Sequence, residues 1–498
     1  MNQHTVNPEN VKRVPMMAVM LIGAFVGLLN ETLLATALPS IMNDFGIEEN
    51  QVQWLTTAFL LTNGVMIPIS AFLIEKFTTR QLFITALTIF ATGTAIASIS
   101  HTFELLLVAR VIQAAGSGIM LPLMMTVMLR IFPVEKRGAA MGMAGIVISF
   151  APAIGPTLSG WLLEYFSWRG LFYVVLPIVI IAILVASKFV KNVTEQTNPK
   201  IDIISIVLSS FGFGGLLYGF SSISGGHGGA EASSGINVQA VAIVIAAAII
   251  LTIFIVRQLK IAKPMLEFRV FKYPIFSLSL IITMIVLMAL IGAETMLPLY
   301  MQNTRGFTAL ESGLMLLPGA IVMGIMSPIT GMLFDKFGAK WLATIGMSIV
   351  TVTTFLFTSL EMDTAYSYLV IIYAIRMFGL SLVMMPVMTA GLNQLPEEWH
   401  PHGTAMANTM QQVSASIGTA ILITTMTTSA SNYEPNASAL EGLSETEAMT
   451  QIASNASIAG YNAAFWLATI LSIAGLCLTF FIKNKSKPQQ EKSEQMAQ

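Results

Sequence analysis

Fourteen apolar runs, most of them about 20 residues long, constrain this chain more than any other feature of its sequence. A helix needs about 20 predominantly apolar residues to cross the hydrocarbon core of a bilayer. The runs lack the period-two alternation that is typical of membrane strands. We therefore predict an all-α polytopic membrane protein with 14 transmembrane helices, at roughly 16–38, 51–74, 82–99, 104–129, 138–162, 168–190, 201–221, 237–259, 275–301, 309–334, 340–359, 366–392, 403–427 and 460–483.

The composition agrees with this prediction. Of the 498 residues, 55% are hydrophobic and 10% are charged, whereas about 25% are charged in ordinary globular proteins. The net charge of −1 offers no basic surface for nucleic acid, and the single cysteine excludes intrachain disulfides and cysteine-based metal sites. The chain has no phosphate-cradling glycine-rich loop with a lysine, so we expect neither ATP hydrolysis nor a cofactor.

Basic residues predict how the helices are oriented. Of the 25 lysines and arginines, 21 fall on one side of the predicted bundle, and only Arg169 and Arg305 fall on the other side. Arg110 and Arg376 lie within predicted helices. Because basic residues accumulate in cytoplasmic loops, we expect a multi-pass protein of the cell membrane with both termini in the cytoplasm.

An internal repeat divides the chain into two halves. The segment 71–80, "AFLIEKFTTR", matches 331–340, "GMLFDKFGAK", at an offset of 260 residues, and Gly46 matches Gly306 at the same offset. Such repeats are typical of secondary transporters, whose substrate site lies between the repeats. We predict an N-terminus at 1–15, an N-terminal six-helix half at 16–190, two intervening helices with their loops at 191–274, a C-terminal six-helix half at 275–483, and a tail at 484–498. The loops 222–236 and 428–455 are expected to be external linkers.

Several motifs resemble those of one large transporter family. "GMLFDKFGAK" resembles the signature between helices 2 and 3 of the major facilitator superfamily, and "RVIQAAGSG" (110–118) resembles its fourth-helix motif. "APAIGPTLSGW" (151–161) resembles the fifth-helix motif of its antiporters. With 14 helices, the chain is similar to the drug:proton antiporters of this superfamily. "LNETLLATALPSIMNDFGI" and "QVQWLTTAFLLTNG" resemble the lincomycin and multidrug efflux proteins of Gram-positive bacteria.

The resemblance implies a proton-coupled antiporter that exports lipophilic, often cationic drugs or antibiotics. The expected partners are these small molecules, protons and the lipid bilayer, and we expect a monomer. The alternative is a facilitator or importer of a defined metabolite in the same fold. An intramembrane enzyme would need a catalytic constellation within the helices, and no histidine lies deep in any apolar run.

Glu31 is the first candidate for coupling chemistry. Only Glu31 and Glu294 among the 26 acidic residues fall well inside predicted helices, where a charge costs at least about 2.5–3.5 kcal/mol. Gly23, Gly27 and Ala35 share the face of Glu31 and predict that this face packs in the bundle interior. We interpret Glu31 as a proton and substrate switch. The alternative is a permanently protonated acid that ties helices together.

Three further polar positions complete this prediction. Glu294 shares a helix face with Pro298 and Gln302. It either acts directly on protons or substrate, or it has a structural or solvent-exposed position near the helix end. Arg110 and Gln113 form a polar stripe, and the resemblance implies a role in proton coupling. The alternative for Arg110 is that its side chain reaches the membrane interface.

The remaining candidates concern the conformational change. Arg376 lacks the glutamine that follows Arg110, and we favour a structural role for it. The glycines and prolines of the fifth helix are expected to allow close packing and bending: Gly142, Gly145, Pro152, Gly155, Pro156 and Gly160. Charged residues in two loops are expected to latch the halves on the cytoplasmic side: Glu75, Lys76, Arg80, Asp335, Lys336 and Lys340. Possible cavity-lining residues are Asn30, Asn408, Gln411 and Gln412; the alternative for the last three is that they only form hydrogen bonds between helices. His400 and His402 are assigned to a cytoplasmic loop without supporting ligands, so no metal site is expected.

Overall fold

The computed structural model describes residues 12–194, 196–197, 202–223, 238–435 and 444–482. Within these ranges the fold is all-helical and contains no strand, which confirms the predicted class. Among the described residues, thirteen helices are long and apolar enough to cross a membrane, and the count reaches 14 when the bent fifth helix is included. Helices satisfy all of their backbone hydrogen bonds internally, which lipid requires of a spanning segment.

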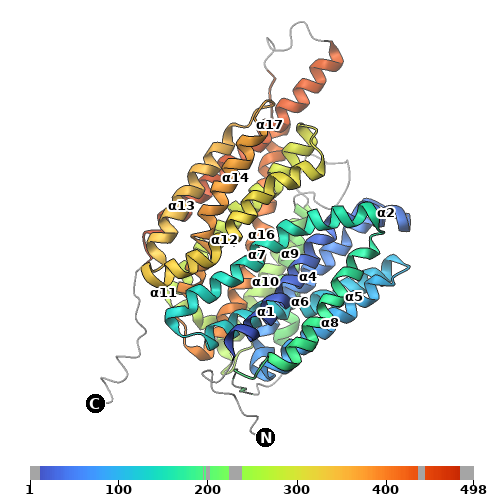
Figure 1. Cartoon of the computed structure of the whole chain (residues 1–498). Coiled ribbons are helices and arrows are strands. Elements are labelled where there is room, and N and C mark those ends of the chain that lie inside the picture. The colour runs from blue at the N-terminus through green and yellow to red at the C-terminus, as the bar shows by residue number, and fades with distance from the viewer. Residues whose placement is uncertain (1–11, 195, 198–201, 224–237, 436–443, 483–498) are drawn as a thin grey trace.

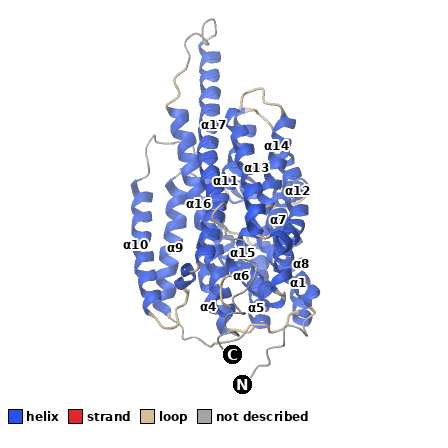
Figure 2. Ribbon diagram, turned by 90° about the vertical axis from the view of Figure 1, so that its left-hand side faces the viewer, coloured by secondary structure: helices blue, strands red, loops and turns tan. Residues whose placement is uncertain are grey.

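In the described part of the chain, the long helices follow one another as an N-terminal half, an intervening pair and a C-terminal half, and Figures 1 and 2 show their arrangement. The N-terminal half contains α1 (Arg13–Leu33), α4 (Trp54–Lys76), α5 (Thr79–Ser98), α6 (Phe103–Ile131), α7 (Arg137–Tyr165) and α8 (Arg169–Phe189). The intervening pair is α9 (Ile203–Ile223) and α10 (Val238–Lys260). The C-terminal half contains α11 (Pro274–Leu299), α12 (Ala309–Phe337), α13 (Ala339–Leu356), α14 (Tyr366–Ser381) with its short continuation α15 (Met384–Leu392), α16 (His400–Ser431) and α17 (Glu445–Thr479). The short helices α2 (Leu38–Phe45) and α3 (Glu49–Val52) connect α1 to α4.

The two ends of the bundle differ in how the halves meet. We call the end at which α1 begins and α17 ends the terminal face, and the opposite end the distal face (Figure 2). The buried apolar side chains form two clusters, one in each half. The N-terminal cluster also includes Phe276, Leu392 and Ala405, which lie near the terminal ends of α11, α15 and α16. The apolar cores of the halves are therefore joined at the terminal face.

The internal repeat is visible in the backbone. Gly46 and Gly306, which the sequence aligns at an offset of 260 residues, adopt positive φ angles of 63° and 71°. Gly46 ends α2, and Gly306 follows the π-helical turn Tyr300–Thr304 that ends α11. A residue with a Cβ is disfavoured in this left-handed region. Each half therefore turns from its first helix toward its second through an equivalent glycine.

The segment before the last span differs from the prediction. The sequence predicts an external loop at 428–455, but α16 continues to Ser431 and α17 already begins at Glu445. Ser444 and Glu447 form a capping box at the start of α17, which stabilises a helix that is too polar for an apolar-run criterion to detect. The predicted loop 222–236 lies almost entirely outside the described residues, as do the tail 484–498 and most of 1–15.

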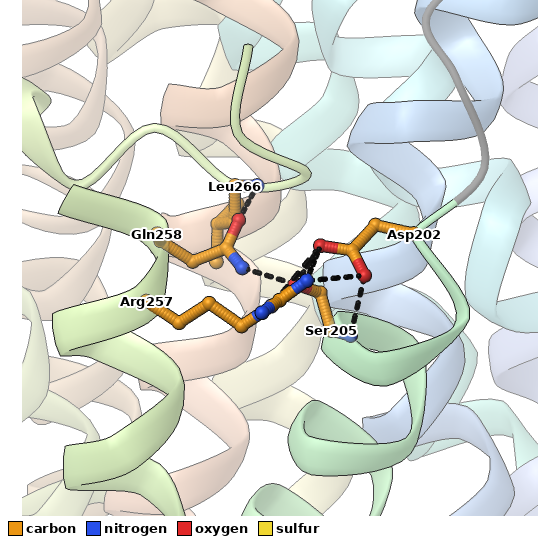
Figure 3. Close-up of polar contacts among 5 residues, drawn as sticks. All are labelled: Asp202, Ser205, Arg257, Gln258 and Leu266. Atoms are coloured by element: carbon orange, nitrogen blue, oxygen red, sulfur yellow. Dashed lines mark hydrogen bonds and ion pairs between the residues drawn. The ribbon is translucent and has the colours of Figure 1, made fainter. Parts of the chain in front are cut away.

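A polar cluster fastens the intervening pair together near the terminal face (Figure 3). Arg257 donates from Nη2 to both carboxylate oxygens of Asp202 at 3.0 Å. The Asp202 carboxylate also accepts hydrogen bonds from the backbone N–H and the hydroxyl of Ser205, at 3.2 and 2.6 Å. Gln258 donates to Ser205 Oγ at 2.6 Å and accepts from the backbone N–H of Leu266 at 3.3 Å. The cluster thus joins the start of α9, the end of α10 and the segment that leads to α11.

Arg257→Gln should weaken this attachment. Burial raises the pKa of the Asp202 carboxyl, but the hydrogen bonds from Ser205 and Arg257 outweigh burial and hold that pKa below its ordinary value. The stabilisation is therefore present at neutral pH and is lost only as the pH falls through the lowered pKa. We expect the variant to lose about 1 kcal/mol of stability at pH 7, measured as a lower thermal midpoint in detergent. Lys260→Gln removes the same charge from an exposed position on α10 and is the control; equal losses in both variants would contradict the assignment.

Candidate functional site

The buried arginine of α6 is the centre of the polar site in the N-terminal half. Arg110 is 0% exposed. Its guanidinium donates to Gln113 Oε1 at 2.9 Å, to the carbonyl oxygen of Asn30 at 3.5 Å and to that of Leu55 at 3.4 Å. The guanidinium carbon also lies 4.1 Å from the ring centroid of Phe59. Arg110 therefore joins α6 to α1 and α4, and its side chain does not reach the membrane interface.

Gln113 extends this site to α5. It donates to Thr94 Oγ1 at 2.9 Å and accepts from the Asn30 amide at 3.2 Å. Asn30, a predicted cavity-lining residue, is only 2% exposed and is bound to Gln113 in this conformation. The polar stripe that the sequence shows on one helix is thus a contact among four helices, α1, α4, α5 and α6.

Glu31 lies next to this network on α1. Its side chain is half-buried, and the carboxyl lies within electrostatic range of the Arg110 guanidinium. The following residue, Thr32, donates to the carbonyl oxygen of Ala151 on α7 at 3.4 Å. Glu31 is therefore a partly accessible acid beside a fully buried cation, close to the helix that contacts the other half.

The C-terminal half places a second buried arginine beside a second acid. Arg376 on α14 is 0% exposed and donates to Thr354 Oγ1 at 3.2 Å and to the carbonyl oxygen of Ala289 at 2.6 Å. Glu294 on α11 is exposed and lies within electrostatic range of Arg376 and Tyr373. The sequence prediction gave Arg376 only a structural role. The internal repeat could have predicted the contact of Arg376 with Thr354, because Thr354 lies 260 residues after Thr94, which belongs to the Arg110 network.

At the terminal face, α7 and α12 hold the halves together; Figure 1 shows them side by side. Asp335 accepts hydrogen bonds from the backbone N–H groups of Gly138 and Ala139, at 2.9 and 3.0 Å. These two N–H groups lie in the first turn of α7, where the helix dipole favours a negative charge. A Cβ added to Gly331 would collide with the carbonyl oxygen of Gly138. Asp335 thus links α12 to the start of α7 in the other half.

A second link at the terminal face joins α16 to α4. His402 Nδ1 accepts from the backbone N–H of Glu267 at 3.4 Å, so Nε2 carries the proton and donates to Glu75 Oε1 at 2.8 Å. The predicted loop position of the histidines is wrong, because α16 begins at His400 and both rings are buried. Sequence reasoning therefore identified Glu75 but missed its partner. The described residues contain no group of three or more His, Cys, Asp or Glu side chains that could hold a metal.

The other predicted latch residues are arranged differently. Lys76 lies over the rings of Phe72 and Phe77, and Arg80 donates to the carbonyl oxygen of Ser187, so both contact their own half. Lys336 is exposed and Lys340 is half-buried. An unpredicted residue, Arg137, reaches across to Asn393 at 3.2 Å and to Glu397 at 3.9 Å.

The glycines of the fifth helix differ in their contacts along its length. Gly142 and Gly145, toward the terminal face, pack directly against Ser327 of α12. Gly155 packs against Thr32 of α1, whereas a Cβ at Gly160 would meet no atom within 4 Å. The helix bends by 40° between Pro152 and Thr157. The glycines of α7 that meet the other half are therefore those toward its terminal end, Gly142 and Gly145.

The residues of α16 that the sequence predicts to line a cavity also differ in burial along their helix. Asn408 is 2% exposed and donates to Thr404 O at 2.8 Å, so it belongs to the closed terminal side in this conformation. Thr404 itself lies 2.8 Å from the hydroxyl of Thr126 in the other half. Gln411 and Gln412, further toward the distal face, are half-buried.

Two repeated six-helix groups that meet along α7 and α12 define a polytopic membrane transporter rather than an enzyme. The chain belongs to the Major Facilitator Superfamily, whose pattern it matches over residues 20–419. It is 50% identical to the "Uncharacterized MFS-type transporter YcnB" of Bacillus subtilis, over 98% of both chains. It is 42% identical to the lincomycin resistance protein LmrB of Listeria innocua, over 97% of this chain and 99% of that protein. The crystal structure of the human organic anion transporter MFSD10 (TETRAN) shares the fold, with a TM-score of 0.66 over 94% of this chain and 99% of that chain at 13% identity.

Proposed function

We propose that this protein is a proton-coupled antiporter that exports lipophilic, often cationic drugs or antibiotics across the cytoplasmic membrane. The observation that carries the proposal is the place of Glu31, a half-buried acid beside the fully buried Arg110. A lincomycin resistance protein among the relatives supports the substrate class. The 32 methionines provide adaptable apolar side chains that suit varied substrates.

Opposing effects on Glu31 provide the switch. Removal from water favours the neutral acid, whereas the Arg110 charge favours the carboxylate. Either effect changes when the halves move and the site gains or loses water. The neutral acid leaves no charge for a cationic substrate, and the carboxylate attracts one. Proton and substrate therefore compete for the same group, which is the requirement for exchange of one against the other.

The contacts between the halves support alternating access around this site. They concentrate at the terminal face, where Asp335 binds the start of α7 and His402 binds Glu75. Arg110 lies seven residues from the distal start of α6, or about 10 Å along the helix axis. The site is thus closer to the distal face than to the closed contacts. Breaking the terminal contacts and closing the distal ends would expose the site to the other side.

We also propose that the terminal face is cytoplasmic. The basic residues of the terminal loops, including Lys76, Arg130 and Lys336, outnumber those of the distal loops, where Arg169 and Arg305 lie. This distribution is the one that the positive-inside bias produces. The described conformation is then closed toward the cytoplasm, and Glu31 exchanges protons with the outside.

Purified protein in liposomes provides the test. With an acidic lumen and a pH-sensitive dye inside, we expect ethidium or a lincosamide to enter the lumen and to trigger release of luminal protons. Protein-free liposomes under the same gradient give the background. Substrate movement without proton movement, or movement only down its own gradient, would favour the alternative of a metabolite facilitator or importer.

A further inference from the structure

The two buried arginines occupy equivalent places in the two halves. Arg110 and Arg376 lie 266 residues apart, each on the fourth helix of its half. Each guanidinium donates to a main-chain oxygen of the first helix of that half, at Asn30 or at Ala289. The repeat therefore preserves the contact as well as the residue type.

A threonine on the third helix of each half completes the equivalence. In the N-terminal half Arg110 reaches Thr94 through Gln113, and in the C-terminal half Arg376 donates to Thr354 directly. The residue three positions after Arg376 is Gly379, whose missing side chain leaves no intermediate group. The C-terminal half lacks the glutamine of the N-terminal half, and this absence led the sequence prediction to a structural role for Arg376. A direct hydrogen bond from Arg376 to Thr354 takes the place of that glutamine.

One guanidinium nitrogen of each arginine takes no part in the hydrogen bonds described above. Within the described part of the chain, Nη2 of Arg110 and Nη1 of Arg376 are buried and have no hydrogen-bond partner. A buried charged donor without an acceptor is costly, and a carboxylate is its strongest available partner. In each half one acid lies within electrostatic range of that guanidinium: Glu31 in the first and Glu294 in the second.

We infer that the C-terminal half holds a second proton-exchange site, in which Arg376 positions and stabilises the ionised carboxylate of Glu294. This inference rests on the proposed function. When Glu294 loses its proton to water, the carboxylate gains the free Nη1 of Arg376 as a partner; when it takes a proton back, the pair separates. Two protons then move for each substrate, one through Glu31 and one through Glu294.

Few other ionisable groups lie near enough to perform this exchange. The groups within electrostatic range of Glu294 are Arg376 and Tyr373, both on α14. None of the ionisable side chains on the helices packed against α11 is among them. There is none on α15, and those of α16 are His400 and His402 at its terminal start. Those of α17 are Glu445 and Glu447 at its distal start with Tyr461 and Cys477 within it, and those of α12 are Glu311, Asp335 and Lys336 at its ends; the helical turns that flank α11 carry Arg269, Lys272 and Tyr300.

The number of protons follows from how far ethidium accumulates in acidic liposomes. With the membrane potential clamped at zero by potassium and valinomycin, one coupled proton supports about a tenfold accumulation per pH unit, and two protons support about a hundredfold. We expect wild type to approach the hundredfold limit and Glu294→Gln to approach the tenfold limit. Arg376→Lys should retain the wild-type slope, whereas Arg376→Gln should show the Glu294→Gln slope and a changed pH profile of transport rate.

The controls separate this inference from the proposed function. Arg305→Gln removes an arginine that binds Tyr300 and Thr364 near the distal face, and it should keep the wild-type slope. A tenfold limit in wild type, or an unchanged slope in Glu294→Gln, would overturn the second site while leaving a one-proton antiporter intact. A failure of wild type to accumulate ethidium under any pH gradient would instead overturn the proposed function.

Discussion

Glu31→Gln is expected to abolish drug accumulation driven by a pH gradient, while the protein still reaches the membrane. Glutamine keeps the size and the hydrogen-bonding capacity of glutamate but cannot release a proton. In the exchange that we propose for Glu31, proton and substrate compete for its carboxylate, so the variant loses the step that makes proton release a condition of substrate binding. In liposomes with an acidic lumen, we expect the internal and external substrate concentrations to become equal, because a proton that binds at Glu294 does not displace substrate and drives no accumulation without Glu31. The loss is at least about tenfold per pH unit.

The matched control is Glu104→Gln, which removes an exposed acid from the first turn of α6. It should accumulate substrate as wild type does. Exchange of labelled for unlabelled substrate in the absence of a pH gradient should persist in Glu31→Gln. This exchange would demonstrate that the variant is a folded carrier. Retained proton-driven accumulation in Glu31→Gln would refute the switch and would leave Glu31 as a neutral acid that ties helices together.

Gly331→Val should have the second large effect, because it prevents closure of the terminal face. The Cβ of any residue at this position would collide with the carbonyl oxygen of Gly138, and a backbone atom cannot rotate away. The crossing of α7 and α12 must then open, which also separates Asp335 from its partners, Gly138 and Ala139. We expect transport to fall to background, since one of the two alternating states is lost.

Gly313→Val is the control on the same helix, because a Cβ at Gly313 would meet no atom within 4 Å. Closure is read from a cysteine placed at Thr404, which is 0% exposed, in a chain whose native Cys477 is replaced by serine. Maleimide should label this cysteine readily in Gly331→Val and slowly in Gly313→Val and in the unaltered background. Equal labelling with full transport in Gly331→Val would show that the close crossing is not required.

The sequence by itself determined the class of fold, because lipid leaves a chain few choices. Runs of about 20 apolar residues must become helices when no water is present to bind the backbone. The predicted spans therefore agree with the helices to within a few residues at most ends, and the aligned glycines Gly46 and Gly306 share one backbone conformation. The exception is α17, which begins at Glu445 through its capping box and not through apolar burial.

Only the tertiary structure decided which polar groups meet. The length of an apolar run predicts where a helix lies along the chain but not which helix packs beside it. Interactions such as those of His402 with Glu75 or Arg376 with Ala289 join residues far apart in sequence. Asn30 and Asn408 are polar residues within spans, and the packing around them buries both. Hydrogen bonds and charges act over a few ångströms, so the functional arrangement follows from how the two halves pack against each other.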